Sequence, residues 1–474
     1  MKRRDALSLI PLSLTGLARA ASGQTLDNMR YDQPMVGAYK EYCYEAEPGM
    51  PLSAQYLNRV RDMLVWIRET QSENLLEASY AIADTVEKGH TCWCAWDMGH
   101  NTNFDMFPER NGVPEIITMG YDPKKSSKGD LFLASIWGGP HEDLVKKDIF
   151  VIGGPAPWGG DSRGQHLLSP DVRERRLRPY SKIWIETNIT TVGAIMYVPG
   201  MPAPTGPVSG IVGLTTYWMM LADACRVLAK HGKSVPVRGD EPVLEDDDPR
   251  VSLYDPLMDD YFEQLMLEIE MIGSERGNMR KIAKMAVDAV LDGGHVWVYS
   301  RYRNSLSVEA QTRRGGLTMT RGVHEQDGKL VTYTGDFAPK PNDIVIMGVW
   351  EPDDEADLRH LDSFRRAGLK VASIGPMMRN LLVPEGRTVP KETDVHVGRM
   401  CDTYGLFAIP GFERHVCPTS GALINQMFWA TCMEIVDELR DRTGDVPGVF
   451  FSAALKGGRP HMHKMQRLFE ERGY

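Results

Sequence analysis

Apolar residues along this chain recur at helical spacing in some stretches and form short uninterrupted runs in others. Between residues 57 and 67, and again between 75 and 86, they return every three or four positions, which predicts two amphipathic helices. A longer apolar stretch at 210–228 predicts a buried helix. Short apolar runs between these helices predict five buried strands, at residues 91–95, 116–118, 131–136, 149–152 and 183–185.

The second half of the chain shows the same alternation. Its apolar pattern predicts helices at 265–272, 282–291, 358–367 and 423–439, and strands at 296–298, 344–349 and 371–374. Continuous apolar strands that alternate with helices are typical of a parallel sheet covered by helices on both faces. The predicted fold class is therefore α/β.

Short motifs occur twice, in the same order and with similar gaps, which indicates one fold duplicated within the chain. The matched pairs are Pro51-Leu52 and Pro256-Leu257, Gly89-His90 and Gly294-His295, Arg110-Asn111-Gly112 and Arg314-Gly315-Gly316, 130–137 and 343–350, and Pro207-Val208-Ser209-Gly210 and Pro418-Thr419-Ser420-Gly421. The duplication predicts two domains, at residues 51–233 and 256–474, joined by an acidic linker at 234–255.

The N-terminus carries the features of an export signal. Lys2-Arg3-Arg4 precedes an apolar stretch at 7–17, and Ala18-Arg19-Ala20 offers small residues for cleavage. The paired arginines resemble a twin-arginine signal, and the alternative is a basic tail before an ordinary helix. We expect a signal at 1–24, a surface arm at 25–50 and a periplasmic protein with no membrane contact once the signal is removed.

Charge and cysteine content narrow the classes of partner and cofactor. The net charge is −10, and no basic patch with interleaved aromatic residues occurs, so nucleic acid is not an expected partner. The acidic run at 245–248 is interpreted as a solvated linker, with a calcium site as the alternative. Seven cysteines without a CxxC motif predict mainly buried thiols, with room for one disulfide and no structural zinc. No cofactor is predicted.

Candidate ligand residues lie where the predicted strands end. In an open parallel sheet, ligands bind beyond the carboxyl ends of the strands, beside helix N-termini. This rule selects three places in each repeat: loops 97–101 and 301–305, loops 137–142 and 350–355, and the helix starts at Ser209 and Ser420.

The chain resembles the phosphosugar-binding branch of the sugar isomerase (SIS) domain family. The similar segments are 67–71, Gly99-His100, 313–317 and 447–458, and together they span both repeats. The resemblance implies two flavodoxin-like three-layer sandwiches that pair within one chain as an internal pseudo-dimer. It also implies a carbohydrate or carbohydrate derivative as ligand, with further homo-oligomerisation open.

The chain departs from the family in the loops that hold phosphate. Asp97 lies near the first glycine of the family's loop, Asn101 replaces its serine, and Trp137-Gly138 and Trp350 replace a serine-rich second loop. A carboxylate repels phosphate, by several kcal/mol near a protein surface at about 4 Å. These changes favour a non-phosphorylated sugar, whereas Arg301, Arg303 and Ser305 keep an anion site in the second repeat as an alternative.

Aldose–ketose isomerisation needs one base that moves a proton between neighbouring carbons, and an acid for ring opening. The predicted catalytic residues are His100, His141, Glu142 and Glu309, where Glu309 matches a glutamate of the family and Asp105 lies at a similar place in the first repeat. Each has a plainer interpretation, as a helix cap, a solvated residue or a core residue. The predicted ligand-binding residues are Asp97, Gly99, Asn101, Trp137, Gly138, Ser209, Arg301, Arg303, Ser305, Trp350 and Ser420.

The leading functional hypothesis is an exported carbohydrate-binding protein that isomerises a non-phosphorylated sugar at one of its two sites. A non-catalytic sugar sensor is the first alternative, because both phosphate loops have diverged. A phosphosugar binder that uses the second repeat and a scaffold without ligand are the others. No metal site is predicted, since His461 and His463 lack a third ligand nearby in the sequence.

Overall fold

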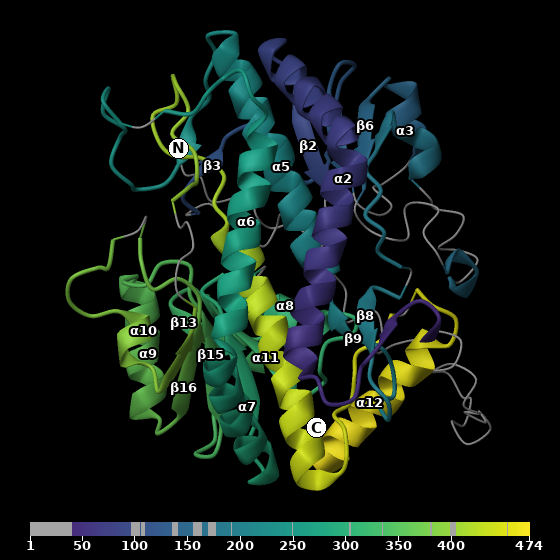
Figure 1. The fold of residues 1–474 in the computed structure, drawn as a ribbon, viewed down its shortest axis with the longest axis vertical. Coiled ribbons are helices and arrows are strands. Elements are labelled where there is room, and N and C mark those ends of the chain that lie inside the picture. The colour runs from purple at the N-terminus through teal and green to yellow at the C-terminus, as the bar shows by residue number, and fades with distance from the viewer. Residues whose placement is uncertain are drawn as a thin grey trace.

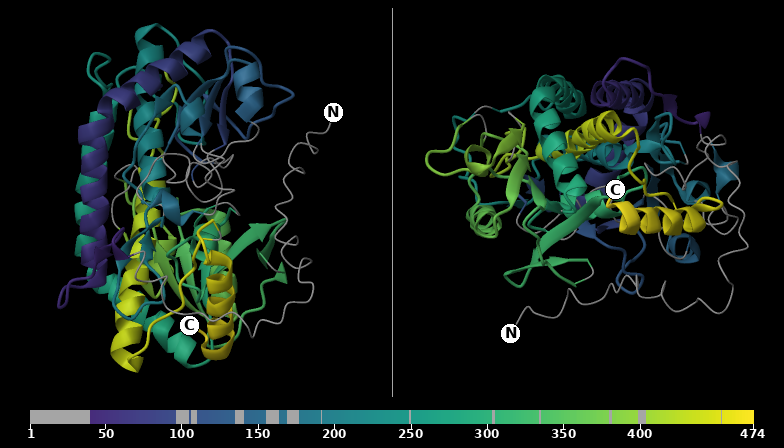
Figure 2. Two further views of the ribbon diagram at one scale, coloured as in Figure 1. Left: turned by 90° about the vertical axis from the view of Figure 1, so that its right-hand side faces the viewer. Right: turned by 90° about the horizontal axis from the view of Figure 1, so that it is seen from below.

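The computed structural model describes residues 40–95, 105, 110–134, 141–154, 164–168, 177–190, 192–248, 250–302, 305–333, 335–379, 382–398, 404–452 and 454–474. Two parallel sheets lie beside a set of long helices that run side by side through the middle of the molecule (Figures 1 and 2). The predicted α/β class is confirmed.

The first sheet contains five parallel strands in the order β4-β2-β5-β6-β7. Their bounds are Ile117–Met119 (β4), Cys92–Ala95 (β2), Leu131–Ala134 (β5), Phe150–Gly153 (β6) and Ile183–Trp184 (β7). Each predicted strand of the first repeat is therefore present, shifted by one or two residues. Two small sheets accompany it: β1 (Tyr44–Glu45), β8 (Ala194–Tyr197) and β9 (Thr205–Pro207) in one, β3 (Val113–Pro114) and β10 (Val237–Arg238) in the other.

The second sheet repeats the order of the first. Its parallel strands run β12-β11-β15-β16-β17, and β13 and β14 extend the β12 edge as antiparallel strands. Numbered within each repeat, both sheets have the flavodoxin-like order 2-1-3-4-5. The bounds are Val296–Tyr299 (β11), Thr320–Gln326 (β12), Lys329–Thr332 (β13), Gly335–Asp336 (β14), Ile344–Gly348 (β15), Lys370–Ile374 (β16) and Val395–Val397 (β17).

The helices form an inner layer that the two repeats share and an outer cover on each sheet. The inner layer contains α2 (Leu52–Glu87), α5 (Ser209–Lys230), α6 (Leu257–Ser274), α7 (Arg276–Leu291) and α11 (Ser420–Thr443). The outer faces of the sheets carry α3 (His141–Lys146) and α9 (Glu355–Arg366) over separate apolar clusters. The remaining helices are η4 (Gln165–Leu167), η5 (Arg178–Tyr180), α8 (Leu306–Thr312), α10 (Val389–Glu392) and α12 (Gly458–Arg472).

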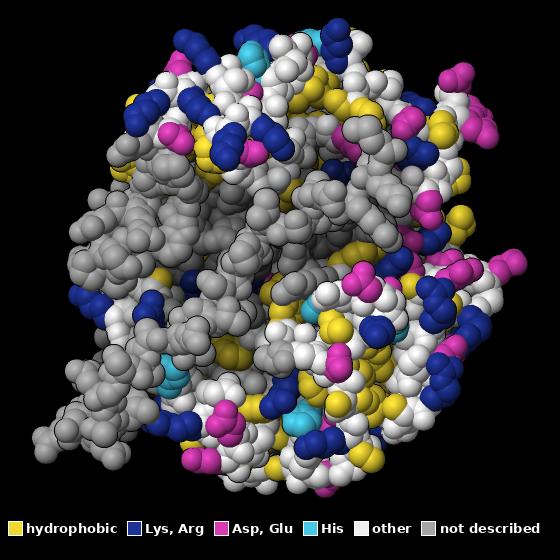
Figure 3. All heavy atoms as spheres, turned by 180° about the vertical axis from the view of Figure 1, so that it is seen from behind, with side chains coloured by type: hydrophobic (Ala, Val, Ile, Leu, Met, Phe, Trp, Pro, Cys, Tyr) yellow, Lys and Arg dark blue, Asp and Glu magenta, His cyan; other side chains and the backbone are white. Residues whose placement is uncertain are grey.

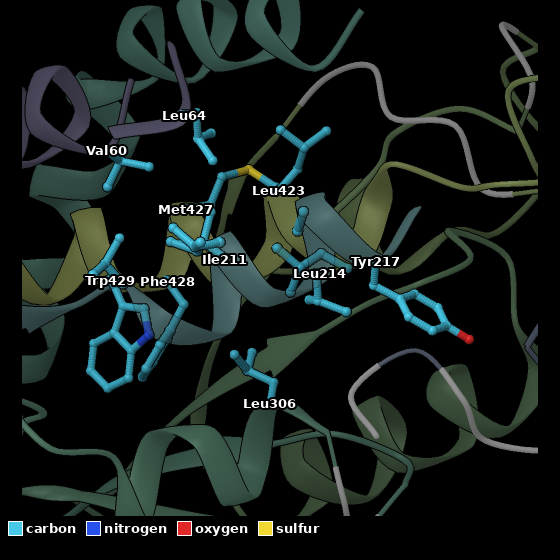
Figure 4. Packing of buried hydrophobic residues seen from close by; sticks show 14 of the residues in the cluster. Val60, Leu64, Ile211, Leu214, Tyr217, Leu306, Leu423, Met427, Phe428 and Trp429 are labelled. Carbon is cyan, nitrogen blue, oxygen red and sulfur yellow. The ribbon is translucent and has the colours of Figure 1, made fainter. Parts of the chain in front are cut away.

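The inner helices pack across the repeats. α2 of the first repeat contacts α11 of the second, and α5 contacts α6 and α11. In Figure 4, Leu64 of α2, Leu214 of α5 and Leu423 of α11 point into one apolar cluster. α5 is long and apolar enough to cross a membrane by length and composition, but its most apolar window is buried inside the protein. The internal pairing of the two repeats is thus built on the hydrophobic effect.

Equivalent hydrogen bonds confirm the duplication. Asp130 accepts from the Trp93 indole N–H at 2.9 Å, and Asp343 accepts from the Trp297 indole N–H at 2.6 Å. The matched tyrosines behave in the same way, since Tyr56 donates to the Pro207 carbonyl at 2.5 Å and Tyr261 donates to the Pro418 carbonyl at 3.2 Å. The duplicated Pro-Leu and Pro-x-Ser-Gly motifs therefore meet within each repeat.

One predicted correspondence is shifted by a residue. The Gly112 carbonyl accepts from the Cys417 N–H, and the Gly315 carbonyl accepts from the Gly206 N–H. Both glycines have positive φ, at 73° and 78°, so Gly112 matches Gly315 and Arg110 matches Arg313 rather than Arg314. The run Arg313-Arg314-Gly315-Gly316 allows either alignment from sequence alone, and only the backbone decides between them.

The predicted linker is tied to both repeats. β10 pairs with β3 of the first repeat, while the N–H groups of Leu244 and Val251 donate to the carbonyls of Glu413 and Ala408. Residues 245–247 of the acidic run remain exposed, as expected for a solvated segment. Six cysteines of the described chain are free, and no group of three His, Cys, Asp or Glu side chains there could hold a metal ion.

The free energy of unfolding is expected to depend on pH through His396. Its Nδ1 lies 2.8 Å from Ser373 Oγ, and burial lowers its pKa from about 6.5 to about 4. Between these values the unfolded chain binds a proton that the folded chain does not, so stability falls as pH falls from 6.5 to 4. The loss is about 3 kcal/mol. Denaturant unfolding of the wild type and of His396→Asn between pH 4.5 and 7.5 tests this, because the asparagine keeps a hydrogen-bonding group and does not titrate. If the free energy of unfolding depends on pH in His396→Asn as it does in the wild type, the assignment of this dependence to His396 is wrong.

Candidate functional site

A segment of the first repeat lies against the carboxyl end of the second sheet. Trp350 and Glu351 follow β15, and these two consecutive residues contact the first repeat separately. The Trp350 indole N–H donates to Asp105 at 3.2 Å, and Glu351 accepts a hydrogen bond from the Asn111 amide. The edge of the sheet where ligands are expected is therefore shared by the two repeats.

The inner part of this edge is a buried cluster of Asp105, Arg110, Trp218, Trp350 and Ser420. Asp105 is fully buried, forms an ion pair with Arg110 at 3.2 Å, and accepts from the Trp218 indole N–H at 3.0 Å. Arg110 also donates to Ser420 Oγ at 2.6 Å, at the start of α11. A buried carboxylate with this many donors is held in one position.

The second repeat has an equivalent cluster around Glu309. Glu309 accepts from the Trp429 indole N–H at 3.1 Å and from Arg313 Nε at 2.8 Å, and it is 1% exposed. Trp218 and Trp429 occupy the same place in α5 and α11, nine residues after Ser209 and Ser420. Burial raises the pKa of Glu309, and Arg313 opposes that effect.

The two buried carboxylates lie at the N-terminal ends of α5 and α11. A methyl group added at Gly421, the second residue of α11, would overlap the Asp105 carboxylate. A methyl group at Gly210 in α5 would lie 3.2 Å from a Glu309 oxygen. Helix N-termini attract anions because of their free N–H groups and the helix dipole. Here the protein's own carboxylates take that place, and each comes from the opposite repeat.

The outer part of the edge consists of Asn111, Asp240, Glu351, Arg379 and Tyr404, here called the rim cluster. Asn111 is 1% exposed, and the other four are more accessible. Arg379 forms an ion pair with Glu351 and donates to the Tyr404 hydroxyl at 2.5 Å. The Asn111 side-chain oxygen accepts from the Asp240 N–H at 2.9 Å. Glu351 and Arg379 are 15% and 25% exposed, so a ligand can reach them.

Burial and neighbouring charges shift the pKa values of side chains in the rim cluster. Burial raises the pKa of Glu351, and the charge of Arg379 acts in the opposite direction. Burial also raises the pKa of Tyr404 to about 12. A second ion pair joins Arg379 Nε to Asp353 at 2.9 Å. The cluster therefore offers a carboxylate, a guanidinium, an amide and a phenol, which are groups that hydrogen-bond sugar hydroxyls.

The neighbouring loop after β11 holds a cation that is already paired. Arg301 forms an ion pair with Asp354 at 2.6 Å, next to the buried pair of Tyr299 and Asp357. Ser305 is fully buried and donates to the Tyr302 carbonyl at 2.6 Å. An anion that bound Arg301 would have to compete with Asp354.

The structure brings together only part of the predicted site. Trp350, Ser420 and Asp105 meet in the buried cluster, whereas Ser209 is buried at the start of α5 and Glu309 is buried on α8. Their predicted ligand-binding and catalytic roles stay predictions. His141 and Glu142 begin α3, as the alternative interpretation expected, but their side chains lie outside the described part of the structure. Outside it entirely lie Asp97, Gly99, His100, Asn101, Trp137, Gly138 and Arg303.

None of the five residues of the rim cluster was singled out from the sequence. Asn111 belongs to a duplicated motif, and Glu351 belongs to a predicted ligand loop, so a signal existed for both. Arg379, Tyr404 and Asp240 stand in irregular segments with no spacing that marks them. Their position depends on contacts between residues far apart in the chain.

Comparison with known proteins gives similarities of structure alone. The chain matches no protein-family model and no curated protein sequence. A proposed sugar-binding protein from Salmonella typhimurium is 12% identical, with a TM-score of 0.44, over 82% of this chain and 99% of the other. A proposed phosphosugar isomerase from Clostridium difficile is 10% identical, with a TM-score of 0.43, over 88% and 98%. A further one from Silicibacter pomeroyi is 9% identical, with a TM-score of 0.43, over 84% and 100%.

Proposed function

We propose that this protein binds a non-phosphorylated carbohydrate or carbohydrate derivative at the rim cluster. The observation that carries the proposal is the juxtaposition of Glu351, Arg379 and Asn111 at the carboxyl end of a parallel sheet, where ligands of this architecture bind. Carboxylate and guanidinium side chains form bidentate hydrogen bonds, a geometry that suits neighbouring hydroxyl groups of a sugar. The proposal includes export of the protein from the cytoplasm.

The preference for an uncharged sugar rests on the buried carboxylates. Asp105 and Glu309 lie at the two helix N-termini that would otherwise attract a phosphate, and both are held there by indole and guanidinium donors. Arg301, the described cation in the anion-binding alternative, is paired with Asp354. A phosphate would therefore have to displace an internal ion pair or one of the carboxylates already at the helix N-termini.

Isomerisation is the reaction that this arrangement supports best. Glu351 is the partly buried carboxylate of the rim cluster, and burial raises its pKa, a direction that suits a group that accepts and returns a proton. Arg379, beside it, stabilises the negative charge that develops on an oxygen during enolisation. The catalytic residues predicted in the first repeat, His100, His141 and Glu142, remain candidates for the second proton-transfer group.

Thermal unfolding of the full chain with neutral sugars, sugar acids and sugar phosphates tests the proposal. A ligand at 100 times its Kd stabilises the protein by about 2.7 kcal/mol, which raises Tm by about 2–3 °C for a chain of this length. We expect the shift with a neutral sugar, and its loss in Glu351→Gln and Arg379→Met. Glu355→Gln is the matched control, because Glu355 is 93% exposed and lies four residues further along the chain.

The outcomes separate the alternatives. A shift with sugar phosphates alone, lost in Arg301→Met, would replace the proposal with a phosphosugar site in the second repeat. Binding of a neutral sugar without turnover would leave a sugar sensor. A neutral sugar that still shifts Tm in Glu351→Gln would move the site away from the rim cluster.

A further inference from the structure

Positive charge gathers on one surface of this acidic protein. The basic face consists of residues 122–128, 143–148 and 178–182, which contain seven lysines and arginines against three aspartates, in a chain of net charge −10. Lys147 joins the first two segments by donating to the Ser126 carbonyl at 3.0 Å, and α3 contacts η5 in the third. Figure 3 shows Lys and Arg side chains crowded at the upper left, over this end of the molecule.

The three lysines of segment 122–128 are exposed, and two of them form ion pairs at long distance. The side chains of Lys125 and Lys128 are 77% and 81% exposed, with carboxylates at 3.5 and 3.4 Å. Exposed pairs of this kind contribute little. Two apolar side chains stand among them, because Val145 is 63% exposed and Tyr180 is 40% exposed.

The complementary surface is the acidic segment at 242–248, which contains four carboxylates and no cation. Glu245, Asp246 and Asp247 are exposed, and among the described residues no cationic side chain forms an ion pair with 245–248. An exposed apolar side chain accompanies these charges too, since Val243 is 58% exposed. The two surfaces match in charge and in their exposed apolar side chains.

We propose that two copies of this chain associate through these surfaces, with the basic face of each on the acidic segment of the other. The helices α2, α5, α6 and α11 pack together within one chain, so their packed faces are not available for contact with a second copy. The acidic segment follows β10, which pairs with β3, and Figure 1 places β3 and α3 on opposite sides of one end of the molecule. A two-fold axis through that end would place the basic face of each copy on the acidic segment of the other, so that the same contact forms twice.

Sedimentation velocity of the full chain tests this association. We expect a dimer at about 50 mM salt and a monomer at about 1 M, because the screening length falls from roughly 14 Å to about 3 Å. A monomer at low salt, or a dimer that persists at high salt, would overturn the proposal.

Charge reversal provides the sharper test. Lys124→Glu/Lys125→Glu/Lys128→Glu and Asp246→Lys/Asp247→Lys are each expected to be monomers at low salt, and an equimolar mixture of the two is expected to form a heterodimer. Both contacts are attractive only in that mixture. Lys281→Glu/Lys284→Glu/Lys329→Glu makes the same charge change at exposed lysines elsewhere and is expected to remain a dimer. A mixture that stays monomeric overturns the proposal, and so does a monomeric wild type that binds vesicles of acidic phospholipid.

Discussion

Replacing Asp105 with alanine is expected to lower the free energy of unfolding by about 3–5 kcal/mol. Asp105 and Arg110 have side chains that are 0% and 1% exposed, and they form an ion pair. Without the carboxylate, the buried guanidinium loses its ion pair and keeps its hydrogen bond to Ser420, and the indole N–H groups of Trp218 and Trp350 no longer donate to Asp105. A buried charge without its counter-charge costs far more than the pair contributes when intact.

Denaturant unfolding of three variants measures this effect. Asp62→Ala is the control for a surface ion pair, since Asp62 is 54% exposed and contacts Arg59 at 3.3 Å, and a loss below about 1 kcal/mol is expected. Asp105→Ala/Arg110→Met removes both charges and is expected to recover part of the loss. A single Asp105 variant that loses less than about 1 kcal/mol would show that this network is not what holds the first repeat to the second.

The same network shows what the sequence could and could not predict. The strands, the long helices and the duplication follow from local apolar runs and repeated motifs, and the structure contains them. Helix boundaries were less accurate: the stripes at 57–67 and 75–86 belong to one helix, α2, because residues 68–74 contain no proline or glycine to end it.

Contacts between the repeats could not be predicted, because they join residues far apart in the chain. Trp350 and Asp105 are 245 positions apart, and Asn111 and Glu351 are 240 apart. Local periodicity says which side chains are buried but not which of them meet. Asp105 and Glu309 illustrate this limit, since a charged residue in a short segment is ordinarily solvated, and both are buried here by the opposite repeat.

Replacing Asp223 with alanine is expected to cost about 3–5 kcal/mol as well, because it breaks a second link between the repeats. Asp223 of α5 accepts from the N–H groups of Leu257 and Met258 at 3.2 and 3.0 Å, at the start of α6, which has no cap from its own N-cap side chain. It also pairs with Arg226 at 2.5 Å, and both side chains are buried. The variant removes a helix cap and leaves a buried cation without its carboxylate.

The other repeat supplies a matched control. Asp437 of α11 accepts from the Leu52 N–H at 2.9 Å, at the start of α2, but its ion-pair partner Arg440 is 40% exposed. Asp437→Ala therefore removes a helix cap without leaving a buried charge unpaired. We expect its free energy of unfolding to fall by about 1 kcal/mol. Asp223→Asn should fall between the two, because an amide oxygen still accepts from a backbone N–H. Urea unfolding of all three variants measures the differences. Equal losses in Asp223→Ala and Asp437→Ala would mean that capping, rather than the buried pair, joins the repeats.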